Sequence, residues 1–467
     1  MGVLTARRLA GFLLTAALAL GASAPGALAH PNMSVTFEAP RDLLDPATRD
    51  SALQDLDTLG VRSLRVVLYW YDVAPEHDSA TRPAIDETDP ANYDWDRYDP
   101  LIAAANARGW PVLMTVSGPV PRWATRSGRD TLTRPSPARF QQFMTAVARH
   151  YAGRVATWSI WNEPNLPRFL RPQFAGGGRP ASPQLYRKLY DAGRRGLIAA
   201  GHGADPTLFG ELAPRGTGSV VAPLTFLRRM LCLDDRYRKR GRGCGQLDTT
   251  GMAHHAYTTR QGPWFVPSGP NDVTIGVLPR LTRALDRAAR AGALPRNLPI
   301  WLTEFGIQSS PDDIQGVSLA RQPEYQAISE RMARSNPRVA SFSQYLLRDD
   351  PPTGPDEYGG FESGLRFAEG RAKPSLDGWR LPLAVRREGG RVSIWGRVRP
   401  ATAPATAELQ VADGSGAFRT LRAVTTDGRG SFTVRGAYRG GRRWRLRWTA
   451  PDGTVRTGAP IRAYARG

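Results

Sequence analysis

Lysine is almost absent from this chain of 467 residues, which contains only Lys188, Lys239 and Lys373. The formal net charge of +21 therefore comes almost wholly from arginine. The arginines are dispersed, and no motif of basic and aromatic residues typical of nucleic-acid binding accompanies them. We therefore expect no nucleic-acid partner, and an anionic polymer of the cell wall is the partner that this charge favours.

Long apolar runs are also absent once the N-terminus is passed. Residues 9–20 (LAGFLLTAALAL) form an apolar run that follows Arg7 and Arg8 and precedes the small-residue site 27–29 (ALA). This pattern is typical of a cleaved signal peptide, here residues 1–29. An uncleaved signal anchor is the alternative, but the run is short and alanine-rich for a membrane span. We expect a secreted, extracellular protein without a membrane span in its mature chain.

Cysteine is nearly as scarce as lysine, with only Cys232 and Cys244, on either side of an arginine- and glycine-rich loop. In an exported chain, two close cysteines predict one disulfide that closes this loop. A metal site is the alternative. No nearby histidine or second cysteine pair completes a set of metal ligands, so the disulfide is favoured.

From residue 32 to about 382 the sequence repeats a short apolar strand, a loop and an amphipathic helix. Eight such units predict a (β/α)₈ barrel, the TIM barrel of the α/β class, over residues 30–382. A doubly wound open sheet is the alternative, but the glycine-rich phosphate loop that it would bring early in the chain is missing. The predicted strands are residues 33–37, 63–69, 111–116, 156–161, 206–210, 251–257, 299–304 and 339–345.

The pattern changes after residue 382. Short segments with alternating apolar residues are separated by Asp-Gly and Gly-Gly turns, which is typical of an all-β sandwich. The predicted strands there are residues 391–398, 408–414, 431–435 and 442–448. Residues 383–467 are therefore predicted to form a small β-sandwich domain that packs on the barrel.

Two glutamates follow apolar strands of the predicted barrel. Glu163 lies in the motif WNEPN after strand four, and Glu304 lies in the motif WLTEFG at the end of strand seven. The carboxyl ends of the strands build the active site of such a barrel. Glycoside hydrolysis requires two carboxyl groups that face each other, one protonated and one ionised. A single glutamate at a strand end is more often a solvated loop residue, and it is the pair that favours catalysis.

With these motifs, residues 32–380 resemble the retaining glycoside hydrolases of clan A, and most closely families 39 and 5. The resemblance rests on WNEP at 161–164, TEFG at 303–306 and HAY at 255–257. It implies that Glu163 is the general acid/base and Glu304 the nucleophile, and that no cofactor or metal is needed. It further implies that Asn162 binds the 2-hydroxyl of the sugar, that Arg65 keeps the nucleophile ionised and that Tyr257 hydrogen-bonds to it.

His255 and Tyr257 are two residues apart on a strand and so point to the same side, where both can reach Glu304 or substrate. The adjacent His254 points the other way, so the two histidines do not form a metal site. Aromatic rings that stack on sugar faces are the other expected feature. Trp123 and Trp264, in loops after strands three and six, are candidates. After strand eight, where several families of the clan place a tryptophan, Gln344 or Tyr345 must serve instead.

The sequence thus predicts a secreted, monomeric retaining glycoside hydrolase that acts on an oligo- or polysaccharide. Two alternatives stay open. A non-catalytic carbohydrate-binding or cell-wall scaffold protein could use the same fold, although intact Glu163 and Glu304 speak against it. A transglycosylase would use the same two glutamates and cannot be separated from a hydrolase at this level.

Overall fold

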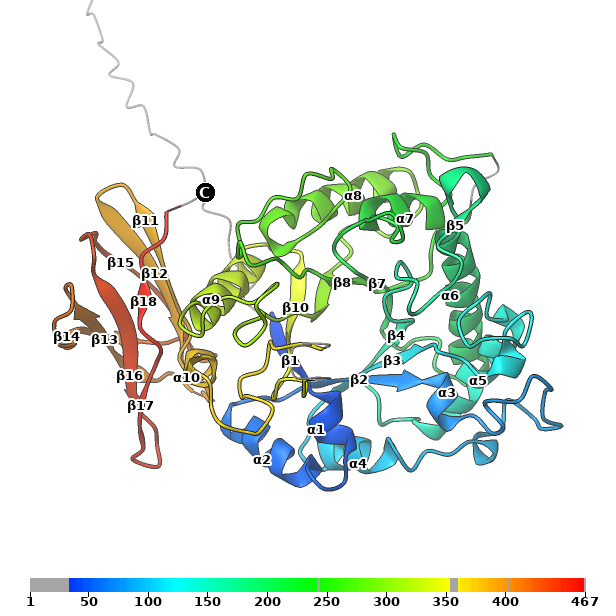
Figure 1. Ribbon diagram of the computed structural model, residues 1–467, viewed down its shortest axis with the longest axis horizontal. Helices are drawn as coiled ribbons and strands as arrows, with labels where there is room; N and C mark the ends of the chain where they lie inside the picture. Colours follow the sequence, from blue (N-terminus) through cyan, green and yellow to red (C-terminus); the bar gives the residue numbers. More distant parts are fainter. Residues whose placement is uncertain (1–32, 242–243, 353–359, 402, 466–467) are drawn as a thin grey trace, which may run out of the picture.

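The computed structural model describes residues 33–241, 244–352, 360–401 and 403–465. The predicted signal peptide lies outside these residues. The described chain forms a barrel and, beside it, a β-domain that ends the chain (Figure 1). Within the described residues, no helix is both long and apolar enough to cross a membrane.

Eight parallel strands close into the barrel, in the order β1-β10-β9-β8-β7-β4-β3-β2. Their side chains are almost wholly buried because the barrel interior lies on one face and helices cover the other. The predicted (β/α)₈ fold is confirmed. The barrel strands are β1 (Ser34–Glu38), β2 (Leu64–Tyr69), β3 (Val112–Ser117), β4 (Thr157–Ile160), β7 (Thr207–Leu212), β8 (Gly251–His255), β9 (Ile300–Glu304) and β10 (Val339–Tyr345).

Helices surround the barrel and begin with recognisable signals. In α5, Pro137 occupies the first turn and the side chain of Ser136 accepts a hydrogen bond from the backbone of Arg139, which caps the helix. The helices are α1 (Pro40–Leu44), α2 (Arg49–Thr58), α3 (Trp70–Val73), α4 (Asp99–Ala107), α5 (Pro137–His150), α6 (Ser182–Ala199), α7 (Pro223–Met230), α8 (Pro279–Arg290), α9 (Arg321–Arg334) and α10 (Pro374–Arg380). A two-stranded ribbon, β5 (Phe174–Ala175) and β6 (Arg179–Pro180), follows β4.

Two antiparallel sheets make up the β-domain, and its core contains Val392, Leu409, Trp444 and Leu446. The sandwich predicted from the sequence is confirmed, with four strands more than the sequence indicated (β11, β14, β17 and β18). One sheet has the order β11 (Leu383–Glu388), β12 (Arg391–Arg397), β15 (Ser431–Ala437). The other contains β14 (Arg419–Thr425), β13 (Thr406–Ala412), β16 (Arg443–Thr449), β17 (Val455–Thr457) and β18 (Ile461–Arg462).

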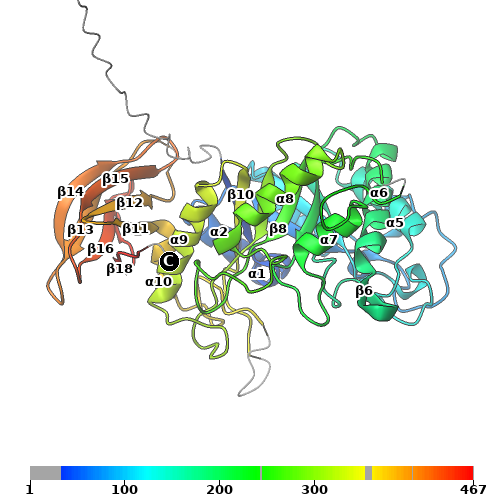
Figure 2. The same cartoon turned by 90° about the horizontal axis from the view of Figure 1, so that it is seen from above.

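The β-domain packs on the side of the barrel through α9 and α10 (Figures 1 and 2). Buried Glu330 on α9 accepts hydrogen bonds from Arg397 at 3.2 Å and from Arg399 at 2.5 Å. Arg331, also on α9, donates to the carbonyl oxygens of Ala384 and Ser393. The interface therefore contains buried ion pairs and lies on the outer wall of the barrel.

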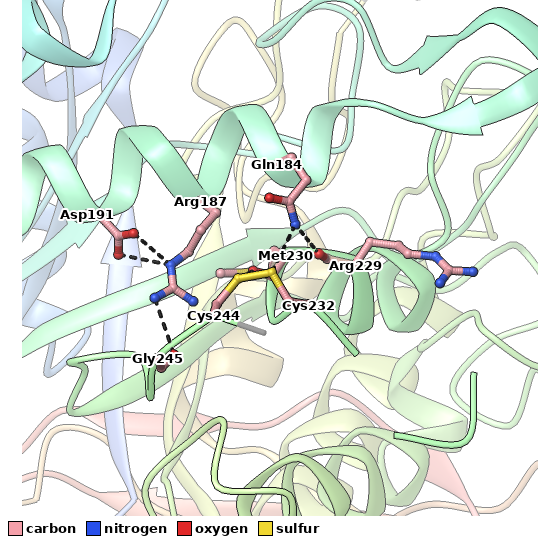
Figure 3. Close-up of a disulfide and its surroundings, with 8 residues drawn as sticks. All are labelled: Gln184, Arg187, Asp191, Arg229, Met230, Cys232, Cys244 and Gly245. Atoms are coloured by element: carbon pink, nitrogen blue, oxygen red, sulfur yellow. Dashed lines mark hydrogen bonds and ion pairs between the residues drawn. A yellow bond between two sulfur atoms is a disulfide. The ribbon is translucent and has the colours of Figure 1, made fainter. Parts of the chain in front are cut away.

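Cys232 and Cys244 form the predicted disulfide, just after α7 (Figure 3). Gln184 on α6 lies over it, with its amide nitrogen 3.6 Å from the Cys232 sulfur and bonded to the carbonyl oxygen of Arg229. Arg187, one turn further along α6, pairs with Asp191 and donates to the carbonyl oxygen of Gly245. The disulfide thus closes the arginine-rich loop against α6.

Candidate active site

Glu163 and Glu304 both lie at the carboxyl end of the barrel. Glu304 is the last residue of β9, and Glu163 follows β4 by three residues. Trp161 and Glu163 have φ angles of 72° and 37°. This left-handed backbone is uncommon for residues other than glycine, and it turns the chain sharply after β4. The side chain of Glu163 is 13% exposed and that of Glu304 is 10% exposed, so both carboxyl groups can be reached from the barrel mouth.

The last residue of the WNEPN motif fixes this turn in place. The side chain of Asn165 is fully buried and donates to the carbonyl oxygens of Ala213 and Val221, both at 3.1 Å. The side-chain oxygen Oδ1 of Asn165 accepts a hydrogen bond from the backbone N–H of Ala213 at 2.9 Å. The loop after β4 is therefore tied to the loop after β7, and the position of Glu163 depends on both.

Arg65 on β2 is completely buried and lies at the centre of the polar network. It donates to Oε2 of Glu304 at 3.1 Å, the contact expected for a cation that keeps a nucleophile ionised. It also donates to Oδ1 of Asn162 at 2.7 Å and so orients the amide beside Glu163. Its remaining partners are Glu38, Glu211 and Thr115.

His255 is the last residue of β8 and Tyr257 lies two residues beyond it, so the strand is shorter than predicted; between them, their side chains contact both candidate catalytic glutamates. Nδ1 of His255 lies 2.9 Å from Oε1 of Glu163 and 3.6 Å from Oε2 of Glu304. The hydroxyl of Tyr257 donates to Oε1 of Glu304 at 2.7 Å. His254 points away from them, and its Nε2 contacts the carbonyl oxygen of Val273 at 2.8 Å. The two histidines therefore have separate surroundings.

The surroundings of these groups shift their pKa values in different directions. Burial raises the pKa of Glu163 above its usual value, against the opposing influence of His255. Burial alone would lower the pKa of His255, but the neighbouring carboxylates of Glu304, Glu163 and Glu211 raise it to about 10. Burial lowers the pKa of His254 to about 4. His255 is thus a cation and His254 is neutral at pH 7.

Two further glutamates, which the sequence analysis did not single out, belong to the same network. Glu38 ends β1, and Glu211 lies near the end of β7; each is bonded to Arg65. Burial raises the pKa of Glu38 to about 8 despite Arg65. Burial alone would raise the pKa of Glu211, but Arg65 and His255 together lower it to about 2. The site therefore contains one buried neutral carboxyl group and one buried carboxylate besides the expected pair.

The three aromatic candidates lie in different surroundings. Tyr345 is partly exposed and its ring meets Phe361 edge-on; burial raises the pKa of its hydroxyl, and Glu304 and Glu38 add to this. Trp123 is only 4% exposed, packs edge-on against Trp70 and donates to the carbonyl oxygen of Pro75, so its ring belongs to the core.

Trp264 and Gln344 also pack against other parts of the protein. Trp264 contacts Tyr325 and Tyr464, and it lines a cavity of about 450 Å³ between the barrel wall and the β-domain. Gln344 is fully buried and bonds to Gln326 and to the carbonyl oxygen of Ser363. The structure thus places Tyr345 near Glu304, whereas Trp123, Trp264 and Gln344 pack against other side chains.

A metal centre is not formed by the described residues, in which no three histidine, cysteine, aspartate or glutamate side chains are arranged to hold an ion. Arg65 and His255 instead provide the positive charge among the four glutamates. The arrangement can hold one carboxyl group protonated and another ionised within a short distance, which is what acid-assisted nucleophilic displacement requires.

No protein-family model matches the chain, and no curated protein matches its sequence. Solved structures do match. A family 39 glycoside hydrolase from Bacteroides cellulosilyticus WH2 superposes with a TM-score of 0.53 at 15% identity, over 88% of this chain and 81% of that one. A monomeric beta-xylosidase from Caulobacter crescentus CB15 gives 0.52 at 17%, over 91% and 96%. A glucosidase from Croceicoccus marinus gives 0.52 at 12%, over 90% and 95%. The chain therefore has a fold similar to that of family 39 glycoside hydrolases.

Proposed function

We propose that the chain is a secreted retaining glycoside hydrolase that cleaves O-glycosidic bonds by double displacement. The single observation that carries this proposal is the spacing of Glu163 and Glu304 around one ring nitrogen. Their oxygens lie 2.9 Å and 3.6 Å from Nδ1 of His255, so these two oxygens are at most 6.5 Å apart, the sum of the two distances. Retaining enzymes hold their carboxyl groups about 5–5.5 Å apart, whereas inverting enzymes need roughly 6.5–9.5 Å.

In the first step, Glu304 attacks the anomeric carbon while Glu163 gives its proton to the departing glycosidic oxygen. The raised pKa of Glu163 favours its acid form before this step. Arg65 and the Tyr257 hydroxyl both donate hydrogen bonds to Glu304 and so orient its carboxyl group for the attack. The products are a covalent glycosyl-enzyme and the released alcohol.

In the second step, Glu163 is a carboxylate and takes a proton from water, which attacks the anomeric carbon and frees Glu304. Two inversions at this carbon give net retention. Asn162, whose Oδ1 is held by Arg65, lies beside Glu163 where the 2-hydroxyl of the sugar would bind. Tyr345 is proposed to contact the sugar from the end of β10.

The proposed substrate is an oligo- or polysaccharide, and the structural neighbours guide the choice of probes. The chain should be assayed on 4-nitrophenyl β-D-xyloside and β-D-glucoside and on a panel of plant and bacterial polysaccharides. We expect hydrolysis of at least one of them, with the anomeric configuration retained in the first product seen by proton NMR. An inverted first product would refute the mechanism, and binding without turnover would favour the carbohydrate-binding alternative.

Variants of the two glutamates test their separate roles. Glu304→Ala should abolish turnover, because no nucleophile remains. Glu163→Ala should lower the rate by roughly 10²–10⁴-fold, the usual contribution of general acid-base catalysis. Added azide should restore part of the Glu163→Ala activity and give a glycosyl azide of retained configuration. Glu388→Gln is the matched control, because this glutamate lies in the β-domain, paired with Arg386. Azide that replaces a missing nucleophile gives the inverted glycosyl azide. If the retained azide forms with Glu304→Ala and the inverted one with Glu163→Ala, the two roles are reversed.

A further inference from the structure

Glu211 is a buried carboxylate that the proposed mechanism does not use. Its side chain is completely buried, so it does not reach a substrate in the barrel mouth. It nevertheless lies on β7, beside the turn that carries Glu163, and it contacts Arg65 and His255. Its position raises the question of whether it serves the fold alone or the chemistry of its neighbours.

The side chain of Glu211 is linked to Glu163 through His255. Oε2 of Glu211 lies 3.3 Å from Nε2 of His255, and Nδ1 on the other side of the same ring lies 2.9 Å from Oε1 of Glu163. Oε1 of Glu211 accepts a hydrogen bond from Thr115 at 2.9 Å, which fixes the rotation of the carboxylate. One imidazole therefore bridges a buried carboxylate and the proposed acid/base.

The main chain of Glu211 provides a second link. Its carbonyl oxygen accepts a hydrogen bond from the backbone N–H of Glu163 at 3.1 Å. Both residues have left-handed backbone, with φ of 47° and 37°, and a shift of register between Gly210 and Leu212 marks a bulge in β7. Bulges of this kind redirect a side chain, here into the barrel interior.

The hydroxyl of Tyr186 on α6 holds this bulge against β4. It donates to the carbonyl oxygen of Ile160 at 2.9 Å and accepts from the backbone N–H of Gly210 at 2.7 Å. The direct pairing of β4 with β7 extends only to Ser159 and Leu208. Beyond that point, the Tyr186 hydroxyl and the Glu163–Glu211 backbone bond hold the two strand ends together.

We propose that Glu211 is a positioning residue for Glu163: its carboxylate holds His255 against the acid/base, and its carbonyl oxygen fixes the Glu163 backbone. This inference rests on the proposed function. A role in the fold alone is the alternative, and Glu330 provides the comparison. Glu330 is also a buried carboxylate, but its partners are arginines at the domain interface, and no active-site residue contacts it.

The proposal has a defined consequence for the pH dependence. The charged or titratable groups that face His255 are the carboxyl groups of its ion pairs, its neighbour on β8, and Arg65 and Tyr257, which contact those carboxyl groups. These groups are Glu163, Glu211, Glu304, His254, Arg65 and Tyr257. Glu211→Gln removes one anion from the imidazole, so the pKa of His255 falls.

The experiment compares wild type, Glu211→Gln and Glu330→Gln with 4-nitrophenyl and phenyl glycosides of the sugar that the wild type cleaves fastest. 4-Nitrophenol departs without much acid assistance, whereas phenol depends on Glu163. We expect Glu211→Gln to lose about tenfold or more in kcat/KM on the phenyl glycoside and clearly less on the 4-nitrophenyl glycoside. Glu330→Gln should leave this ratio unchanged.

A measurement on the resting protein keeps the inference separate from the proposed function. The side-chain nitrogens of ¹⁵N-labelled histidine report the titration of each imidazole, and His255 should lose its proton at a lower pH in Glu211→Gln than in wild type. Thr115→Val, which removes the 2.9 Å bond to Glu211, should cause a smaller shift in the same direction and serves if Glu211→Gln does not fold.

The outcomes distinguish the two proposals. A wild type that cleaves no glycoside refutes the proposed function, and the histidine titration still tests the Glu211–His255 link. If the wild type is active, an unchanged leaving-group ratio together with an unchanged His255 titration in the variant refutes the positioning role and leaves Glu211 a structural residue.

Discussion

Glu330 at the domain interface gives a sharp test of how the β-domain is held on the barrel. Its side chain is 2% exposed and pairs with Arg397 at 3.2 Å, with Arg399 at 2.5 Å and with Arg334 at 3.7 Å. Burial alone would raise its pKa, but these arginines lower it to about 2, so it is ionised at pH 7. Glu330→Gln keeps the shape and removes the charge, which leaves buried cations without their counter-ion.

The expected loss of unfolding free energy is about 3–5 kcal/mol, the usual cost of removing one partner from a buried ion pair. With an unfolding entropy of about 2.1 cal/mol/K per residue, some 430 residues that unfold together give roughly 0.9 kcal/mol/K. The melting temperature should therefore fall by about 3–6 °C in differential scanning calorimetry. If the two domains unfold separately, the loss should appear as an earlier first transition.

The matched control is Glu388→Gln, which removes a partly exposed glutamate paired with Arg386 in the same domain. Exposed pairs contribute about 0–1 kcal/mol, so its melting temperature should change by about 1 °C or less. The double variant Glu330→Gln/Arg399→Met should regain part of the loss, because it removes an unpaired cation. Equal melting temperatures for Glu330→Gln and Glu388→Gln would refute the reasoning.

Two further predictions concern His254 and the disulfide. The folded pKa of His254, about 4, lies below its ordinary value of 6.5, so the unfolded chain binds a proton first and stability falls as pH drops from 6.5 to 4. His254→Gln should remove roughly 2.5 kcal/mol of this loss between pH 7 and pH 4.5 in urea unfolding, and a pH-independent difference from wild type would contradict this. Replacing both Cys232 and Cys244, which are 12 residues apart, by alanine should lower the unfolding free energy by about 3 kcal/mol, measured in the same way, with activity retained. A loss of activity with unchanged stability would show that the loop serves the site instead.

The sequence predicted the barrel well because each strand is a short apolar run between polar loops, and all eight predicted strands overlap the observed ones. Glu163 and Glu304 could be singled out because each follows such a run. Glu38 and Glu211 also follow apolar runs, but neither lies in a motif such as WNEPN or WLTEFG. The predicted strand before Glu211 ends at Gly210.

Gly210 in fact lets β7 continue through a bulge. Its φ is +111°, and a Cβ atom there would lie 2.6 Å from the carbonyl oxygen of Ala253, so only glycine fits. The surroundings of Trp123 and Trp264 were harder to predict, because proline-rich loops are usually exposed. The loop with Trp123 instead folds inward onto Trp70, and Tyr464, some 200 residues away, covers Trp264. Contacts between residues so far apart in the chain cannot be inferred from the local sequence.

The β-domain also contains strands that the sequence pattern did not predict. The strand β14 was not predicted because six of its seven residues are exposed, so it lacks the alternation that marks a half-buried strand. β11 begins with apolar residues but ends in the run Arg386 to Glu388, which resembles a polar loop. Both strands are specified by the hydrogen bonds of their neighbours rather than by their own composition.

Arg65 has a consequence for any attempt to redesign this protein. Its guanidinium contacts side chains from β1, β3, β9 and β7 and from the turn after β4, so residues far apart in the chain share one donor group. Substitutions at these positions should not combine additively, because each changes the partners left to the others. Changes of the proposed specificity are therefore best sought in the loops around the mouth, and transfer of this candidate site to another barrel would require all five partners to move with the arginine.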